Sequence, residues 1–194
     1  MLARGMTPYI FVFIFITAIF AFLGQNRASM AMLLFTLLFF IFNRDPNRTP
    51  LGDGMVAPAD GRIAEATPGR VAIFMSLYNV HVNRSPLEGF VKEVLYRRGG
   101  HTPAFCKSTE KNERNVIVIE TADGLVHVQQ IAGAIARKIV CYVKPGDHVK
   151  RGERIGMIRL GSRVEVTIPN NYEIQVKIND KVRAGETIIA VERI

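Results

Sequence analysis

The first 42 residues constrain this chain most, because they carry almost no charge. They contain nine of the twelve phenylalanines and only two charged side chains, Arg4 and Arg27. Two apolar runs, residues 7–23 and 28–42, are separated by a polar turn of four residues. Each run would form roughly 22–26 Å of helix, slightly less than the hydrocarbon core of a bilayer, which is about 30 Å thick. The pattern therefore predicts a pair of short apolar helices joined by a turn.

We expect residues 1–42 to form a membrane-embedded helical hairpin. A cleaved signal peptide is the poorer interpretation, because no small-residue cleavage site follows the first run and a second run begins at once. Arg4 precedes the hairpin, and Arg44 and Arg48 follow it. The positive-inside rule then places the rest of the chain on the cytoplasmic face of the cell membrane.

Residues 43–194 have the composition of an ordinary soluble domain. The two N-terminal arginines account for +2 of the net charge of +8, so this domain carries the remaining +6. Gly, Pro, Asn and Asp divide it into short β-patterned runs, and helical pattern is limited to residues 103–111 and 132–138. The clearest predicted strands are residues 71–75, 116–120, 125–131, 139–143 and 164–168. Cys106 and Cys141 lack the spacing of a disulfide framework and are expected to be reduced thiols.

An internal repeat indicates how this β domain is built. Residues 143–158 recur as residues 176–191, with seven of the sixteen positions identical. Asp and Gly mark two turns in each copy, and Val and Ile between them are expected to face inward. Together with Ala57-Pro58-Ala59-Asp60-Gly61 upstream, the repeat resembles the barrel-sandwich hybrid of biotinyl and lipoyl domains. We therefore expect a mostly β fold of this type after the helical hairpin.

Several functions that such a fold supports can be weighed from the residues. A biotin or lipoyl carrier needs a lysine at the apex between the repeat copies, but residues 159–175 contain no lysine. The four histidines form no His-x-His pair, so we expect no metal site. A membrane-anchored, non-catalytic scaffold of lipoyl type and a hydrolase that uses Ser162 without cleavage both stay open. No nucleic-acid-binding motif accompanies the basic charge, which fits attraction to an anionic membrane surface instead.

Seven sequence blocks, in order along the chain, resemble the phosphatidylserine decarboxylase family in its short, single-domain form. The blocks are Phe42-Asn43-Arg44-Asp45-Pro46-Asn47-Arg48, Ala57-Pro58-Ala59-Asp60-Gly61, Ile73-Phe74-Met75-Ser76, Asn79-Val80-His81-Val82-Asn83-Arg84, Asn112-Glu113-Arg114, Ala134-Ile135-Ala136-Arg137-Lys138-Ile139-Val140 and Gly152 to Arg163, which includes Leu160-Gly161-Ser162-Arg163. Any single block would be weak, but seven of them form a specific signal.

The resemblance implies a proenzyme that makes its cofactor from its own backbone. Ser162 would attack the Gly161 carbonyl, and the chain would separate into a β chain, residues 1–161, and an α chain, residues 162–194. Because the cut falls between the two repeat copies and the α chain is too short to bury a core alone, we expect the two chains to remain together as a heterodimer. Ser162 would become a covalent pyruvoyl group. His81, oriented by Asp60, would serve as the base for the serine hydroxyl, following the logic of a catalytic triad.

The resemblance also implies the substrate. The pyruvoyl group would form a Schiff base with the amine of phosphatidylserine and take up electrons as CO2 leaves, which gives phosphatidylethanolamine. His81 is also the candidate to return a proton to the carbanion. Arg84, Arg137 and Arg163 are candidate partners of the lipid headgroup, because guanidinium groups bind phosphate and carboxylate well.

Overall fold

The computed structural model describes residues 1–100, 112–133, 138–158 and 162–193. The chain divides into two compact units, residues 1–47 and residues 48–194. The first contains the helices α1 (Thr7–Phe22) and α2 (Asn26–Phe42), at the positions where two apolar helices were predicted. Judged by length and hydropathy, no helix in the described part of the chain could cross a membrane.

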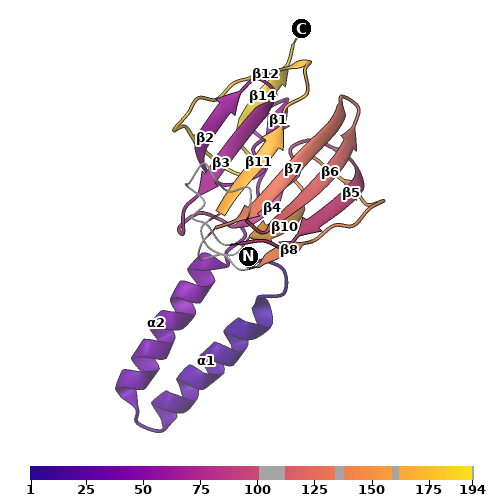
Figure 1. The fold of residues 1–194 in the computed structure, drawn as a ribbon. Coiled ribbons are helices and arrows are strands. Elements are labelled where there is room, and N and C mark those ends of the chain that lie inside the picture. The colour runs from indigo at the N-terminus through magenta and orange to yellow at the C-terminus, as the bar shows by residue number, and fades with distance from the viewer. Residues whose placement is uncertain (101–111, 134–137, 159–161, 194) are drawn as a thin grey trace. The chain divides into compact units, whose positions relative to one another are not determined.

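Within the first unit, α1 and α2 lie side by side (Figure 1), and aromatic rings hold them together. The ring of Phe13 on α1 meets Phe35 and Phe39 on α2 edge to face, with centroids 5.2 and 5.0 Å apart. This is a favourable arrangement of aromatic quadrupoles. The hydroxyls of Thr17 and Thr36 each donate to the carbonyl four residues earlier, so these helices satisfy their few polar side chains internally.

The second unit is built from short strands within its described residues, as the sequence predicted. The strands are β1 (Met55–Val56), β2 (Gly61–Thr67), β3 (Arg70–Met75), β4 (Val82–Arg84), β5 (Gly89–Arg97), β6 (Arg114–Thr121), β7 (Gly124–Ala132), β8 (Ile139–Cys141), β9 (His148–Val149), β10 (Arg154–Ile158), β11 (Ser162–Thr167), β12 (Tyr172–Ile174), β13 (Lys181–Val182) and β14 (Ile188–Glu192). The two predicted helical stretches fall mainly on residues outside the described part, and Ala132 ends β7.

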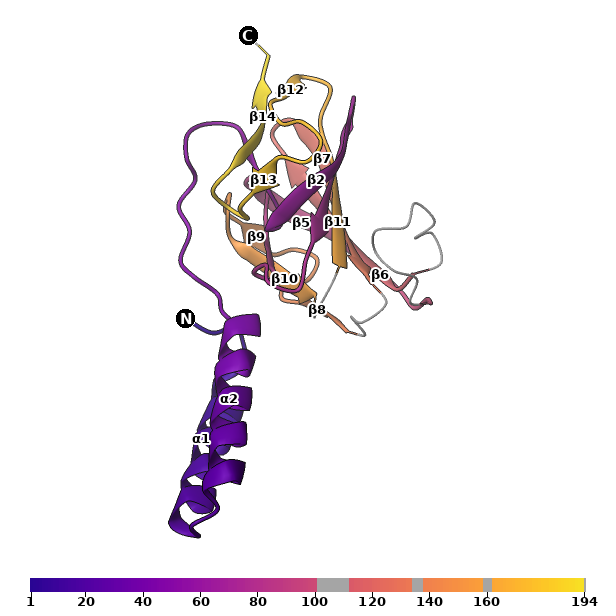
Figure 2. The same cartoon turned by 90° about the vertical axis from the view of Figure 1, so that its left-hand side faces the viewer.

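The strands form three antiparallel sheets around one apolar core (Figures 1 and 2). The largest has the order β13-β2-β3-β11-β7-β6-β5-β9, and the smaller two have the orders β4-β10-β8 and β1-β14-β12. Along β11, Ser162, Val164 and Val166 are buried and alternate with partly exposed residues, so one face of this strand lines the core. The prediction of a mostly β domain is confirmed.

The eight-stranded sheet has two matching halves, which explains the repeat in the sequence. Both β9 and β13 lie in the repeat copies and occupy the two opposite edges of the sheet. β13 pairs with the start of β2, where Val182 lies opposite Gly61, and β9 pairs with the start of β5, where Val149 lies opposite Gly89. Counted inward from either edge, β2 corresponds to β5, β3 to β6, and β11 to β7.

One of the connections that differ between the two halves leads to Ser162. β6 and β7 are joined by a tight hairpin turn, with Thr121 opposite Gly124. The corresponding strands β3 and β11 pair in the same manner, with Met75 opposite Ser162, but residues 76–161 lie between them in the sequence. Ser162 therefore occupies the place of a hairpin residue, although a long segment has replaced the turn.

Gly89 illustrates how closely the strands of this sheet approach one another. A Cβ atom at this position would overlap the carbonyl oxygen of Glu120 on β6. We expect Gly89→Ala to lower the free energy of unfolding by about 1–3 kcal/mol, the usual cost of overpacking. Thermal melting of the full chain in detergent would measure the loss. Lys92→Ala, at an exposed position of the same strand, is the control, and an equal effect of both would contradict the explanation.

Candidate active site

Ser162 is the first residue of β11, and its side chain is completely buried. It lies between two neighbouring strands, opposite Met75 of β3 and Ala132 of β7. Its Oγ donates to the sulfur of Met75 at 3.3 Å. A thioether is a weak acceptor, so this contact holds the hydroxyl without activating it. Gly161, the other half of the predicted cleavage site, lies outside the described residues.

His81 lies just before β4 and is also buried, with an exposed fraction of 1%. Its carbonyl oxygen accepts a hydrogen bond from the N–H of Ile158, the last residue of β10, at 3.1 Å. Ile158 lies four residues before Ser162 in the sequence. Four residues of fully extended chain span at most about 14 Å, so the Cα atoms of Ile158 and Ser162 lie no further apart than this. The fold thus brings His81 and Ser162, two of the predicted site residues, to the same end of the domain.

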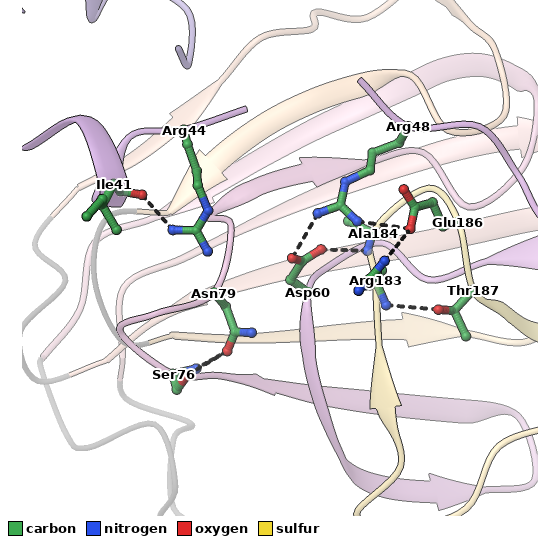
Figure 3. A network of polar contacts seen from close by, with 10 residues as sticks. All are labelled: Ile41, Arg44, Arg48, Asp60, Ser76, Asn79, Arg183, Ala184, Glu186 and Thr187. Atoms are coloured by element: carbon green, nitrogen blue, oxygen red, sulfur yellow. Dashed lines mark hydrogen bonds and ion pairs between the residues drawn. The ribbon is translucent and has the colours of Figure 1, made fainter. Parts of the chain in front are cut away.

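Asp60 is buried in the turn before β2 and is held by two donors (Figure 3). Its Oδ2 accepts from Arg48 at 3.1 Å, and its Oδ1 accepts from the backbone N–H of Ala184 at 2.8 Å. Arg48 also contacts Glu186 at 3.1 Å. Ala184 and Glu186 belong to the second repeat copy, so Asp60 connects the segment that enters the domain to the C-terminal part of the chain.

Sequence reasoning did not predict the ion pair of Arg48 with Asp60. Both residues occur in the blocks that carry the family resemblance, and this was the available signal. Arg48 was instead counted as a charge beside the membrane. The side chains of Arg48 and Asp60 are about nine-tenths buried, and a buried carboxylate normally requires such a charge-assisted partner.

The candidate headgroup arginines have different surroundings. Arg84 on β4 is buried, and its Nη1 donates to the carbonyl of Gly152 at 3.0 Å. Gly185, the counterpart of Gly152 in the second repeat copy, leaves room for the Arg84 stem, because a Cβ there would lie 2.6 Å from its Cδ. Arg137 lies outside the described residues. The side chain of Arg84 therefore packs between the two repeat copies.

Arg163 follows Ser162 on β11 and points to the opposite face of the sheet, since side chains alternate along a strand. It binds Glu165 through Nε at 2.7 Å and Glu65 through Nη2 at 3.0 Å. Arg70 contacts the same two carboxylates, at 2.5 Å to Glu65 and 3.5 Å to Glu165. Two guanidinium groups and two carboxylates thus form one ion-pair cluster on the outer side of β3 and β11.

A row of amide side chains is also buried close to Ser162. Asn83 on β4, Gln130 on β7 and Asn115 on β6 are linked by hydrogen bonds and have exposed fractions of 0–1%. Sequence reasoning did not single them out. Asn83 lies in one of the blocks that carry the family resemblance, whereas Gln130 and Asn115 gave only a weak signal, as polar residues at strand positions that should face the core. Among the described residues, no group of three or more His, Cys, Asp or Glu side chains could hold a metal ion.

Comparison with known proteins places this geometry in a family. A model of the phosphatidylserine decarboxylase family matches residues 35–190. A Methanosarcina barkeri protein, provisionally named an archaetidylserine decarboxylase proenzyme, is 48% identical, and the match covers 98% of both chains. Two proteins named phosphatidylserine decarboxylase proenzyme are also similar. The one from Solidesulfovibrio magneticus is 45% identical over 97% of this chain and 95% of its own, and the one from Geotalea uraniireducens is 40% identical over 95% and 93%.

These findings define the chain first as an enzyme, a carboxy-lyase in proenzyme form. It belongs to the phosphatidylserine decarboxylase family. The resemblance seen in the sequence is thereby confirmed. The comparisons support the decarboxylase over the non-catalytic scaffold and over the uncleaved hydrolase.

The ion-pair cluster behind Ser162 leads to a pH-dependent prediction. The hydrogen bond from Arg70 is the main reason that the pKa of Glu65 lies below its ordinary value of 4.5. A lowered pKa in the folded state contributes stability above pH 4.5, and this contribution is lost as the pH falls through the folded-state pKa. Glu65→Gln should therefore reduce stability at neutral pH, by less than about 1 kcal/mol because the pair is partly exposed.

The measurement is the melting temperature of the full chain as a function of pH. The difference between Glu65→Gln and the unsubstituted chain should shrink as the pH falls below 4.5. Glu93→Gln, at an exposed position of β5, serves as the control. A difference that stays constant across this range would contradict the assigned role of Glu65.

Proposed function

We propose that this chain cuts itself between Gly161 and Ser162 and then decarboxylates a phospholipid whose headgroup is serine. Family membership and the buried position of Ser162 at the start of a central strand together support this function. The product would be the same lipid with an ethanolamine headgroup, which is phosphatidylethanolamine when the substrate is phosphatidylserine. Similarity to proteins named for archaetidylserine and for phosphatidylserine leaves both the diether and the diester lipid as substrates to be compared.

In the proposed cleavage, Ser162 Oγ adds to the carbonyl carbon of Gly161 while His81 accepts the hydroxyl proton. The Gly161–Ser162 C–N bond then breaks, the serine nitrogen is protonated, and an ester links the two residues. Loss of the Ser162 α-proton breaks the Cβ–O bond, which releases residues 1–161 as a carboxylate and leaves dehydroalanine. Addition of water and loss of ammonia convert this residue to the pyruvoyl group.

The surroundings of Ser162 fit such a group. Its position is inaccessible to solvent and held on both sides by strand pairing, so a new chain terminus there would begin inside the protein. The pyruvoyl group supplies an electron sink for the loss of CO2. Burial would also keep water away from the reacting carbon. We propose that His81 returns a proton to that carbon after CO2 has left.

We propose that Asp60 orients His81 and stabilises its protonated form. A carboxylate can accept about four hydrogen bonds, and Arg48 and Ala184 use two of them. We keep Arg84, Arg137 and Arg163 as candidate headgroup partners. Because Arg84 donates to Gly152 and Arg163 to two carboxylates, these two would have to exchange protein partners for the lipid phosphate.

Strand pairing supports a β–α heterodimer after cleavage. In the proposed α chain, β11 pairs with β3 and β7, β13 pairs with β2, and β14 pairs with β1. All four partner strands belong to the proposed β chain. The shorter chain is too small to bury a core alone, so we expect it to stay bound through these ladders until the protein is denatured.

We propose that α1 and α2 hold the enzyme at the cytoplasmic face of the cell membrane. Both helices expose large apolar side chains, among them Phe11, Phe15, Phe22, Leu33 and Leu34. An apolar surface of this kind is typical of a membrane interaction site. The proposed substrate is a phospholipid with two hydrocarbon chains, so the enzyme has to reach it at the surface of the bilayer.

The intact mass of the purified protein tests the cleavage. We expect two chains, residues 1–161 and 162–194, with a pyruvoyl group in place of Ser162, and separation only under denaturing conditions. Ser162→Ala should give one uncut, inactive chain, because the nucleophile is missing. Thr121→Ala, which removes an exposed hairpin hydroxyl, is the control and should be cut normally. An uncut chain in membranes that release CO2 from the lipid would refute the proposal.

His81→Ala tests the proposed base. Loss of a general base typically costs about 10²–10⁴-fold in rate, so both cutting and decarboxylation should slow by this order. Cutting is followed on denaturing gels, and decarboxylation as CO2 release from phosphatidylserine and from its diether counterpart in detergent. His127→Ala, at an exposed position of β7, should leave both rates unchanged. Normal processing and turnover by His81→Ala would exclude the proposed role.

A further inference from the structure

The row of buried amides lies on the same face of the sheet as Ser162. Gln130 is opposite Val164 of β11 on one side and opposite Asn115 of β6 on the other. Ser162 is two residues before Val164, and side chains two residues apart share a face. Asn83 approaches from β4 in the second sheet. Three carboxamides thus extend through the core towards the serine.

The hydrogen bonds of this row fix which way each amide points. Asn115 Nδ2 donates to Gln130 Oε1 at 2.9 Å, and Gln130 Nε2 donates to Asn83 Oδ1 at 2.8 Å. Because Oδ1 of Asn83 faces Gln130, Nδ2 of Asn83 points away from Gln130 and towards Met75. Gly156 on β10 leaves room for this arrangement, since a Cβ there would lie 2.7 Å from Gln130 Nε2.

Asn83 Nδ2 and Ser162 Oγ meet at one atom, the sulfur of Met75. The distances are 3.8 Å from Asn83 Nδ2 and 3.3 Å from Ser162 Oγ. A thioether is a weak acceptor, so a buried amide donor and the reacting hydroxyl share one weak acceptor, and the donor has no strong partner for this hydrogen. Such a group costs stability in the resting protein.

Further along the row, Asn115 Oδ1 has no hydrogen-bond partner among the described residues. A row of amides that is satisfied only in part is a poor way to stabilise a core. The stability that this row of amides costs is better explained by a function. A buried hydrogen-bond donor that points at a reaction site can stabilise negative charge that develops there.

We propose that Asn83 donates its Nδ2 hydrogen to the oxyanion formed when Ser162 attacks, and that Gln130 is the positioning residue that aims it. This inference rests on the proposed cleavage at Gly161–Ser162. As the Oγ–C bond forms, His81 takes the hydroxyl proton, and the carbonyl electron pair moves to the oxygen, which becomes the oxyanion. Asn83 stabilises that charge until the C–N bond breaks and the proton passes to the serine nitrogen. Met75 competes little for the donor, because its sulfur binds weakly.

The decisive variant is Asn83→Asp, which keeps the shape and the acceptor for Gln130 but removes the amide donor. Loss of one oxyanion donor costs about 10²–10³-fold, so we expect self-cleavage to slow by that order. The rate is measured from the fraction of cut chain over time. Because a protonated carboxyl regains an O–H donor, the deficit relative to the unsubstituted chain should narrow as the pH is lowered. The melting temperature of the variant is measured over the same pH range, because a purely structural effect of a buried carboxylate would lower the melting temperature along with the rate; slow cleavage at an unchanged melting temperature assigns the effect to the lost donor.

A second variant tests the same inference in case Asn83→Asp does not fold. Gln130→Met has a similar volume but releases the Asn83 amide, and should slow cleavage less than Asn83→Asp does. Val126→Ala, which opens a cavity at a buried position of β7, is the control for lost stability and should be cut at the normal rate. Normal cutting by both Asn83→Asp and Gln130→Met, or equal slowing by Val126→Ala, would overturn the inference.

Hydroxylamine identifies the step, because it cleaves an ester and leaves amides intact. Uncut Asn83→Asp chain should resist hydroxylamine, since its ester has not formed. Cleavage into two fragments would show that the ester forms without the donor, and would overturn the assignment to the first oxyanion. The same experiments distinguish a failure of the proposed function from a failure of this inference. If the unsubstituted chain is not cut at Gly161–Ser162, both the proposed self-cleavage and the role of Asn83 are refuted. If the unsubstituted chain and Asn83→Asp are both cut at the normal rate, only the role of Asn83 is refuted.

Discussion

The pairing of β11 between β3 and β7 is the constraint on which the rest of the domain depends. This strand joins the two halves of the large sheet, and its first residue is the serine on which the proposed chemistry acts. Its inner face contributes Ser162 and apolar residues to the core, while its outer face carries the Arg163 ion pairs. One strand therefore sets the register, the burial and the orientation of the reacting group.

The two halves of the large sheet have the same strand arrangement but carry different charged residues at equivalent positions. The residue before Gly61 is Asp60, which is buried and bound to Arg48, whereas the residue before Gly89 is Glu88, which is exposed and contacts His148 at 3.3 Å. Equivalent backbone positions thus carry a buried ion pair in one half and a surface contact in the other. The repeated β unit supplies the architecture of both halves, and a few different side chains give the two halves different contacts.

Sequence patterns predicted much of the fold, because they are local. Apolar runs marked α1 and α2, alternation marked β11, and the repeat marked the turns around β9 and β13. Ser162 and His81 were predicted as site residues from family motifs, and the fold brings them to one end of the domain. The partners of Arg48 and Asn83 were not predicted, since each depends on residues from distant parts of the chain. No periodicity reveals which buried amide faces which donor.

The place of Ser162 at the very start of β11 has a consequence for the lifetime of the enzyme. The proposed cut removes a connection without removing a rung of the ladder, so the native state loses little. The unfolded state changes far more, because one chain becomes two that diffuse apart. Refolding of the two cut chains would then be a second-order reaction, and the lifetime of the cut protein would depend on how slowly it unfolds. A molecule of this kind must complete its fold before it matures, and it does so only once.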